Sequence, residues 1–261
     1  LTLGHEVAGT VAAVGTAVST FAPGDRVCVH YQVGCGECSY CADGLEMFCP
    51  QGKMIGNGRP GGHADQIIVP TRNVIPVPDA VSLDHAAVMM FSSATSLHAL
   101  RKGRLRQGET VAIFGVGRLG MSAIQLAILE GAAEVFAVDT NPAKLNKAAA
   151  LGAEPVAAGD VAAIGARGGA DVALDLVGSA AVMRQCLDIL APMGRAGAVG
   201  LTPDSFPVGP YPDLVGGESE LIGASDHTAA EIVELLEHAA AGRLRLDGIV
   251  ERAVPLQAGA V

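Results

Sequence analysis

Tryptophan is absent from this chain of 261 residues, and all aromatic residues together make up only 3% of it. The core must therefore consist mainly of Ala, Val, Leu and Ile, a composition that suits buried parallel strands covered by helices. No uninterrupted apolar run is long enough to span a membrane. The first residues also lack the basic start and apolar stretch of a secretory signal. We expect a soluble, cytoplasmic protein that does not bind a membrane.

Basic residues are scarce as well. The chain has 17 Lys and Arg residues against 27 Asp and Glu, which gives a formal net charge of −10. It therefore lacks the basic surface that proteins binding nucleic acid or anionic membranes require. Half of the residues are hydrophobic and only 17% are charged, which excludes a disordered chain. These proportions favour a folded protein that acts on a small molecule.

The pattern of hydrophobic residues changes near residue 91. Residues 1–90 contain short alternating or apolar runs separated by turn residues, which is typical of a small, irregular β domain. From Phe91 onward, apolar strands alternate with helical stretches, and this alternation continues to about residue 241. Such alternation predicts an α/β domain with a parallel sheet.

Four of the six cysteines lie close together, with the spacing C-x2-C-x2-C-x7-C. They are Cys35, Cys38, Cys41 and Cys49. Neighbouring glycines allow the backbone to turn tightly enough for four thiolates to bind one tetrahedral zinc ion, which would be structural because no open position remains. An iron–sulfur cluster and a pair of disulfides are the alternatives. The seven-residue gap differs from the bacterial ferredoxin pattern, and the missing secretory features disfavour disulfides.

Residues 115–120, GVGRLG, match the G-x-G-x-x-G pattern and lie between the apolar run TVAIF and a helical stretch. This context predicts a dinucleotide-binding turn. Gly115 would form the tight turn, Gly117 would let the backbone approach the pyrophosphate, and Gly120 would allow close contact between helix and strand. Arg118 and Leu119 belong to the same turn and are predicted to contact the cofactor.

Asp139 ends the next predicted strand, 19 residues after Gly120. At this distance a carboxylate accepts hydrogen bonds from the ribose hydroxyls and repels a 2′-phosphate. The sequence therefore favours NAD over NADP. The alternative role for Asp139 is a helix cap before Pro142, and Arg118 is able to attract the phosphates of either cofactor.

Five segments together resemble the zinc-dependent alcohol dehydrogenases of the medium-chain dehydrogenase/reductase superfamily. They are GHEVAGTVAAVG (4–15), GDRV (24–27), the four-cysteine segment, GGHADQIIVP (61–70) and GVGRLG (115–120). The resemblance implies a GroES-like β catalytic domain that contains a structural zinc lobe, followed by a Rossmann domain with a doubly wound parallel sheet. It also implies homodimers or homotetramers, and a chain truncated at both ends.

The expected domain limits follow from this resemblance. The partial GroES-like domain is predicted over residues 1–91, with the zinc lobe over 34–50. The Rossmann domain is predicted over 92–242, and a partial return to the catalytic domain over 243–261.

The resemblance also implies a catalytic zinc ion. Its ligands in the family are a Cys upstream of GHE, the His of that motif, and either a residue just before the Rossmann domain or the motif's Glu. His5 and Glu6 match the motif, but Phe91 occupies the place of the usual third ligand. Ligation by Glu6, as in polyol dehydrogenases of the superfamily, would keep three protein ligands and an open position. The alternative is a chain without a competent catalytic zinc.

The reaction implied is hydride transfer between NAD and an alcohol, with a secondary alcohol or polyol favoured. Thr95 matches a family threonine beside the nicotinamide, and Lys144 matches a lysine that contacts the adenosine ribose. Gly200 and Leu201 are expected near the carboxamide. Two other functions remain open: a non-zinc reductase of enones or quinones, and a cofactor-binding remnant without turnover.

Overall fold

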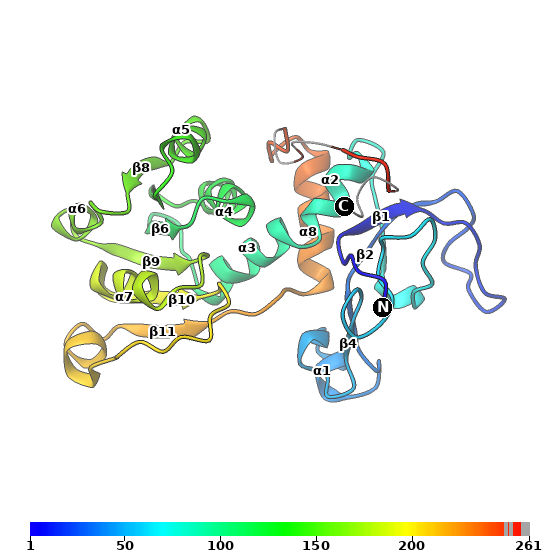
Figure 1. Ribbon diagram of the computed structural model, residues 1–261, viewed down its shortest axis with the longest axis horizontal. Coiled ribbons are helices and arrows are strands. Elements are labelled where there is room, and N and C mark those ends of the chain that lie inside the picture. The colour runs from blue at the N-terminus through cyan, green and yellow to red at the C-terminus, as the bar shows by residue number, and fades with distance from the viewer. Residues whose placement is uncertain (248–249, 251–252, 257–261) are drawn as a thin grey trace. The chain divides into compact units, whose positions relative to one another are not determined.

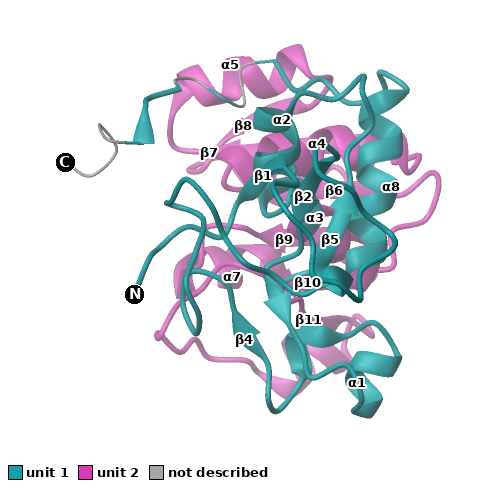
Figure 2. Cartoon of the chain, turned by 90° about the vertical axis from the view of Figure 1, so that its right-hand side faces the viewer, with its two compact units in different colours: residues 1–94, 226–261 teal, residues 95–225 magenta. Residues whose placement is uncertain are grey.

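The protein divides into two compact units. A computed structural model describes residues 1–247, 250 and 253–256. The first unit consists of residues 1–94 and the described residues from Asp226 onward, and the second consists of residues 95–225 (Figure 2). No helix in the described ranges has both the length and the hydropathy that a membrane span requires.

Six parallel strands form the sheet of the second unit (Figure 1). They are β6 (Thr110–Phe114), β7 (Glu134–Asp139), β8 (Glu154–Ala157), β9 (Ala170–Asp175), β10 (Leu190–Ala198) and β11 (Glu220–Gly223). Their order across the sheet is β11-β10-β9-β6-β7-β8. The chain runs from β6 to β8, crosses back to β9 beside β6, and continues to β11, so the predicted doubly wound sheet is confirmed. Ligands of such sheets bind where the winding direction reverses, at the carboxyl ends of β6 and β9.

Helices cover this sheet because its strands are apolar on both faces. In β6, for example, the four residues 111–114 are all buried. Helix α4 (Arg118–Leu129) contacts β6 and β7, α5 (Pro142–Ala150) contacts β7 and β8, and α7 (Ala180–Asp188) contacts β9 and β10. The unit also contains α6 (Ala162–Ala166), the π-helix η3 (Pro210–Val215) and most of α3 (Ser92–Lys102).

The first unit is rich in short antiparallel strands, as the sequence predicted. Strands β1 (Val7–Thr10), β2 (Arg26–Val29) and β5 (Val74–Pro76) form one sheet, and β3 (Gln32–Val33) pairs with β4 (Lys53–Met54). Its helices are α1 (Ser39–Ala42), η1 (Glu46–Phe48), η2 (Thr71–Asn73), α2 (Leu83–Met89) and α8 (Ala229–Ala240). A small core of Val29, Tyr31, Val33 and Ile55 packs against Phe91.

The division of the chain differs from the predicted limits on the C-terminal side. Helix α8 was predicted within the second domain, but it belongs to the first unit and contacts α2. The chain enters the first unit at Asp226, before the predicted residue 243. The physical reason is that an amphipathic pattern identifies a buried face without identifying the core that buries it. The predicted return over 243–261 lies partly outside the described residues.

Candidate zinc and dinucleotide sites

The four clustered cysteines converge in the first unit. Cys35 follows β3, and Cys49 follows η1. Cys38 is the N-cap residue of α1, and Cys41 lies within that helix. Their four sulfur atoms all lie within 4.8 Å of one another. The Cys35 and Cys41 Sγ atoms are 3.9 Å apart, close to the edge of about 3.8 Å that a zinc–sulfur distance of about 2.3 Å gives a tetrahedron. The donor set therefore fits one tetrahedral ion, and all six cysteines are free thiols, not disulfides.

Two glycines make this convergence sterically possible. Gly36 has a φ of +86°, a backbone conformation that residues other than glycine rarely adopt. At Gly34, a Cβ atom would overlap the sulfur of Cys41. The loop between β3 and α1 can therefore reverse direction and still leave room for the sulfur atoms.

The local electrostatics favour a cation among these sulfurs. Backbone N–H groups of Glu37 and Cys38 donate to the Cys35 sulfur and lower the pKa of Cys35 to about 6. The N–H of Gly36 lowers the pKa of Cys41, but burial and hydrogen bonds with the other three thiols outweigh it and raise that pKa to about 12. The thiols therefore cannot all ionise near neutral pH unless a bound cation neutralises them.

The glycine turn follows β6 in the second unit. Gly115 has a φ of +90°, and a Cβ atom there would lie 2.7 Å from Cγ2 of Val177. A Cβ atom on Gly120 would overlap the carbonyl oxygen of Gly115, whereas one on Gly117 would meet no atom within 4 Å. The turn is thus tight at both ends and open in the middle, where α4 begins after Gly117 with no side-chain cap.

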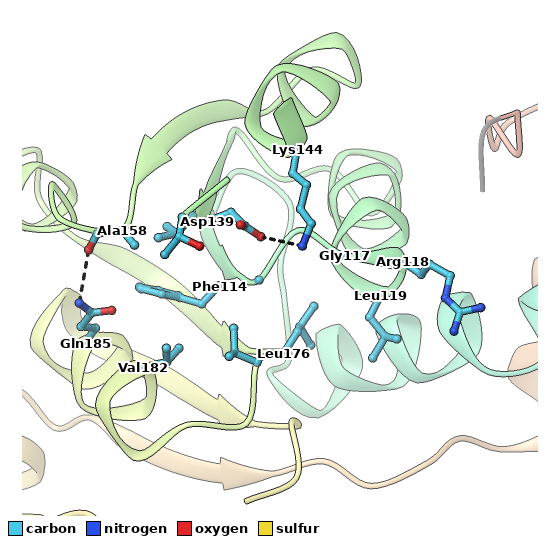
Figure 3. A pocket seen from close by; sticks show the side chains of 15 residues that line it. Phe114, Gly117, Arg118, Leu119, Asp139, Lys144, Ala158, Leu176, Val182 and Gln185 are labelled. Atoms are coloured by element: carbon cyan, nitrogen blue, oxygen red, sulfur yellow. Dashed lines mark hydrogen bonds and ion pairs between the residues drawn. The ribbon is translucent and has the colours of Figure 1, made fainter. Parts of the chain in front are cut away.

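A cavity of about 400 Å³ lies at the reversal point of the sheet (Figure 3). It is lined by seven of the nine residues predicted to bind the cofactor: Gly115, Gly117, Arg118, Leu119, Gly120, Asp139 and Lys144. Sequence reasoning missed its other walls: Phe114, Val138, Thr140, Ala158, Leu176, Val177, Val182 and Gln185. Most of these lie at or just after the carboxyl ends of β6, β7, β8 and β9. That position is the signal that could have identified them.

Asp139 lies between the glycine turn and helix α5. Its carboxylate accepts hydrogen bonds from the N–H groups of Val116 and Asn141, both at 2.9 Å, and lies 3.7 Å from Nζ of Lys144. The cap of α5 is Asn141, whose side chain accepts from the N–H of Ala143 at 2.9 Å. The helix-cap alternative for Asp139 is therefore wrong, and its carboxylate borders the cavity.

A buried aspartate that the sequence analysis missed organises the neighbouring loops. Asp175, at the end of β9, is 2% exposed, and its carboxylate accepts from the N–H groups of Val177 and Gly178 at 2.9 Å. Its backbone oxygen accepts from the N–H of Gly200 at 2.8 Å. Asp175 thus connects the loops that follow β9 and β10. Gly200 and Leu201 do not line the described cavity, so their contact with the cofactor stays a prediction.

His5 has an unusual environment in the first unit. Its Nε2 atom is buried without a hydrogen-bond partner, and its ring packs edge-on against Tyr31 and Phe91, both at 5.1 Å between centroids. A buried, unpartnered nitrogen is costly unless an ion or another group binds it. Phe91 contributes a wall to this environment and no ligand atom. Among the described residues, the four cysteines are the only converging group of three or more metal-binding side chains.

Thr95 is a buried residue of α3 and does not line the described cavity. Its contact with the nicotinamide therefore stays a prediction, as does the role of Glu6.

Comparisons with known proteins agree with both halves of this architecture. Residues 1–79 match the alcohol dehydrogenase GroES-like domain, and residues 119–241 match the zinc-binding dehydrogenase family. The chain is 34% identical over 268 residues to a Mycobacterium tuberculosis protein named "Probable zinc-binding alcohol dehydrogenase", with 99% of this chain and 69% of the relative covered. It is 34% identical over 216 residues to L-threonine 3-dehydrogenase of Anaeromyxobacter dehalogenans, covering 80% of this chain and 62% of the relative.

A solved structure of another dehydrogenase has a similar fold. Galactitol-1-phosphate dehydrogenase from Escherichia coli has a TM-score of 0.87 and 25% identity, covering 95% of this chain and 74% of that chain. The fold and the cysteine site together define an oxidoreductase built from a GroES-like and a Rossmann unit. The chain belongs to the zinc-dependent alcohol dehydrogenase family of the medium-chain dehydrogenase/reductase superfamily.

Proposed function

We propose that this protein transfers a hydride between NAD and a secondary alcohol or polyol. The observation that carries this proposal is the cavity at the reversal point of the sheet, where the glycine turn and Asp139 border one space. When bound, NAD accepts or supplies the hydride, and a catalytic zinc ion acts as a Lewis acid toward the substrate oxygen. The chain's own contribution is to bind and orient these groups.

Different residues of the cavity suit different parts of the cofactor, according to their charge. The open space at Gly117 and the N–H groups at the start of α4 suit the pyrophosphate, and Arg118 adds a positive charge beside them. The Asp139 carboxylate suits the ribose hydroxyls, with Lys144 next to it. This arrangement supports NAD more than NADP, because Asp139 would repel a 2′-phosphate.

The donor set near His5 supports a catalytic zinc bound in part by Glu6. The unpartnered Nε2 of His5 is suited to a metal. Phe91 offers no ligand atom, and Glu6, the next residue in the sequence, is the second candidate ligand. We propose His5 and Glu6 as the ligands that this chain provides. Carboxylate ligation favours harder, oxygen-rich substrates. The names of two relatives, L-threonine 3-dehydrogenase and galactitol-1-phosphate dehydrogenase, indicate hydroxylated substrates for those proteins.

Steady-state kinetics of the purified protein test this function. We expect NADH absorbance to appear with NAD and a secondary alcohol or polyol, and to disappear after treatment with a zinc chelator. A non-zinc reductase would instead consume NAD(P)H with an enone or quinone, and the chelator would not affect it. If neither reaction occurs, the protein is a cofactor-binding remnant and the proposal is wrong.

Nucleotide selection provides a separate prediction. Asp139→Ala should weaken NAD binding by about 10- to 100-fold, because a charge-assisted hydrogen bond to the ribose is lost, and should affect NADP much less. Fluorescence titration with NADH and NADPH measures both affinities. Asp171→Ala is the matched control, since Asp171 also accepts a backbone N–H, that of Thr110, but at the other end of β6. The control should leave the NADH/NADPH ratio unchanged. A wild type that binds NADPH more tightly than NADH would contradict the assignment.

A further inference from the structure

One end of the dinucleotide cavity, at Gln185, lies beyond the residues that would bind the pyrophosphate and the ribose. In Figure 3, Gln185 and Arg118 lie on opposite sides of Asp139. A nucleotide whose phosphates bind near Arg118 and whose ribose binds at Asp139 must therefore extend its base toward Gln185. The walls there are largely apolar, since Phe114, Ala158 and Val182 line the same cavity. Such walls suit the faces of a flat aromatic base.

The amide orientation of Gln185 is determined by its backbone partner. Its Nε2 atom donates to the carbonyl oxygen of Ala158 at 3.4 Å. A carbonyl oxygen can only accept a hydrogen bond, so the amide must present its nitrogen to Ala158. The amide oxygen then points away from Ala158, on the side of Phe114 in Figure 3. Gln185 thus presents a hydrogen-bond acceptor at the base end of the cavity.

We propose that Gln185 recognises the 6-amino group of the adenine base and so determines which purine the cofactor carries. This inference rests on the proposed binding of NAD. Adenine presents a donor at position 6, which matches the Gln185 oxygen. Hypoxanthine presents a keto oxygen at the same position, which would place two acceptors opposite each other and leave both unsatisfied. The site therefore selects an adenine dinucleotide against its deaminated analogue.

The competing role for Gln185 is purely structural, as a link between α7 and the residue that follows β8. The two roles predict different results. A structural link affects the binding of every nucleotide equally. Recognition of the base affects the adenine and hypoxanthine dinucleotides unequally. The ratio of the two affinities therefore separates recognition from structure.

Calorimetric titration of the purified protein with NAD and with nicotinamide hypoxanthine dinucleotide measures this ratio without relying on turnover. We expect the wild type to bind NAD about tenfold more tightly than the analogue. Gln185→Met, which keeps the length of the side chain and removes the acceptor, should reduce the ratio to about one. Gln125→Met is the matched control, because the Gln125 amide also donates to a backbone oxygen, that of Met121, but lies outside the cavity. It should preserve the wild-type ratio.

If Gln185→Met does not fold, Gln185→Glu tests the same role of the side chain. Its carboxylate keeps an acceptor for the 6-amino group, so the preference for adenine should persist. Equal wild-type affinities for the two dinucleotides, or an unchanged ratio in Gln185→Met, would overturn the role of Gln185 while leaving NAD binding intact. Failure of the wild type to bind either dinucleotide would overturn the proposed function itself, and the inference with it.

Discussion

Cys41→Ala is expected to remove the zinc ion from the four-cysteine site and to lower the free energy of unfolding by about 4 kcal/mol. This magnitude applies when free zinc exceeds its dissociation constant about a thousandfold, because a ligand that binds only the folded state stabilises it by mass action. The loss of one thiolate leaves only three of the four sulfur ligands that a closed tetrahedral site needs. Elemental analysis of zinc and thermal unfolding with and without a chelator measure both effects.

Cys28→Ala is the matched control for this experiment. Cys28 is fully buried in β2, outside the cluster, and burial raises the pKa of its thiol to about 12. Its substitution should cost stability through lost packing and leave the zinc content unchanged. A Cys41→Ala protein that retains its zinc and its melting temperature would rule out the structural site.

Glu6→Gln is expected to remove a second, catalytic zinc ion and to reduce the rate of alcohol oxidation by at least about a hundredfold. The reason is that a neutral amide binds zinc much more weakly than a carboxylate, and Phe91 offers no replacement ligand. The wild type should contain two zinc ions per chain, and the variant should retain only the structural one. Metal analysis and NADH absorbance on the same samples measure the two effects together.

Phe91→Cys distinguishes ligation by Glu6 from the more usual cysteine ligand. If Glu6 is the ligand, this variant should keep two zinc ions per chain and change activity through the lost ring contacts with His5 and Tyr31. A wild type with one zinc per chain that oxidises no secondary alcohol or polyol would support the remnant hypothesis. A variant that gains zinc relative to the wild type would show that Phe91 occupies a vacant ligand position.

The features that sequence predicted best are those whose atoms come from one short segment. The four cysteines lie between residues 35 and 49, and the glycine turn occupies residues 115–120. For such features, backbone geometry over a few residues determines which atoms can meet. The parallel sheet was predictable for a related reason, because strands buried on both faces are apolar throughout their length.

Other features depend on contacts between distant segments, and the sequence pattern did not reveal them. The apolar face of α8 is evident from its spacing, but its membership of the first unit is a tertiary contact with α2. Asp175 was missed because its hydrogen bonds form only when the loops after β9 and β10 lie together. Gln185 was missed because its partner, Ala158, follows a different strand.

By itself, the sequence determined the two-part architecture, the convergence of the four cysteines and the tight glycine turn, because each arises from local spacing or from periodic burial. Only the tertiary structure decided which side chains face the base end of the cavity, that Asn141 and not Asp139 caps α5, and that Phe91 packs on His5. These outcomes depend on how separate strands and helices approach one another. That approach is set by the packing of the whole core, which no single segment encodes.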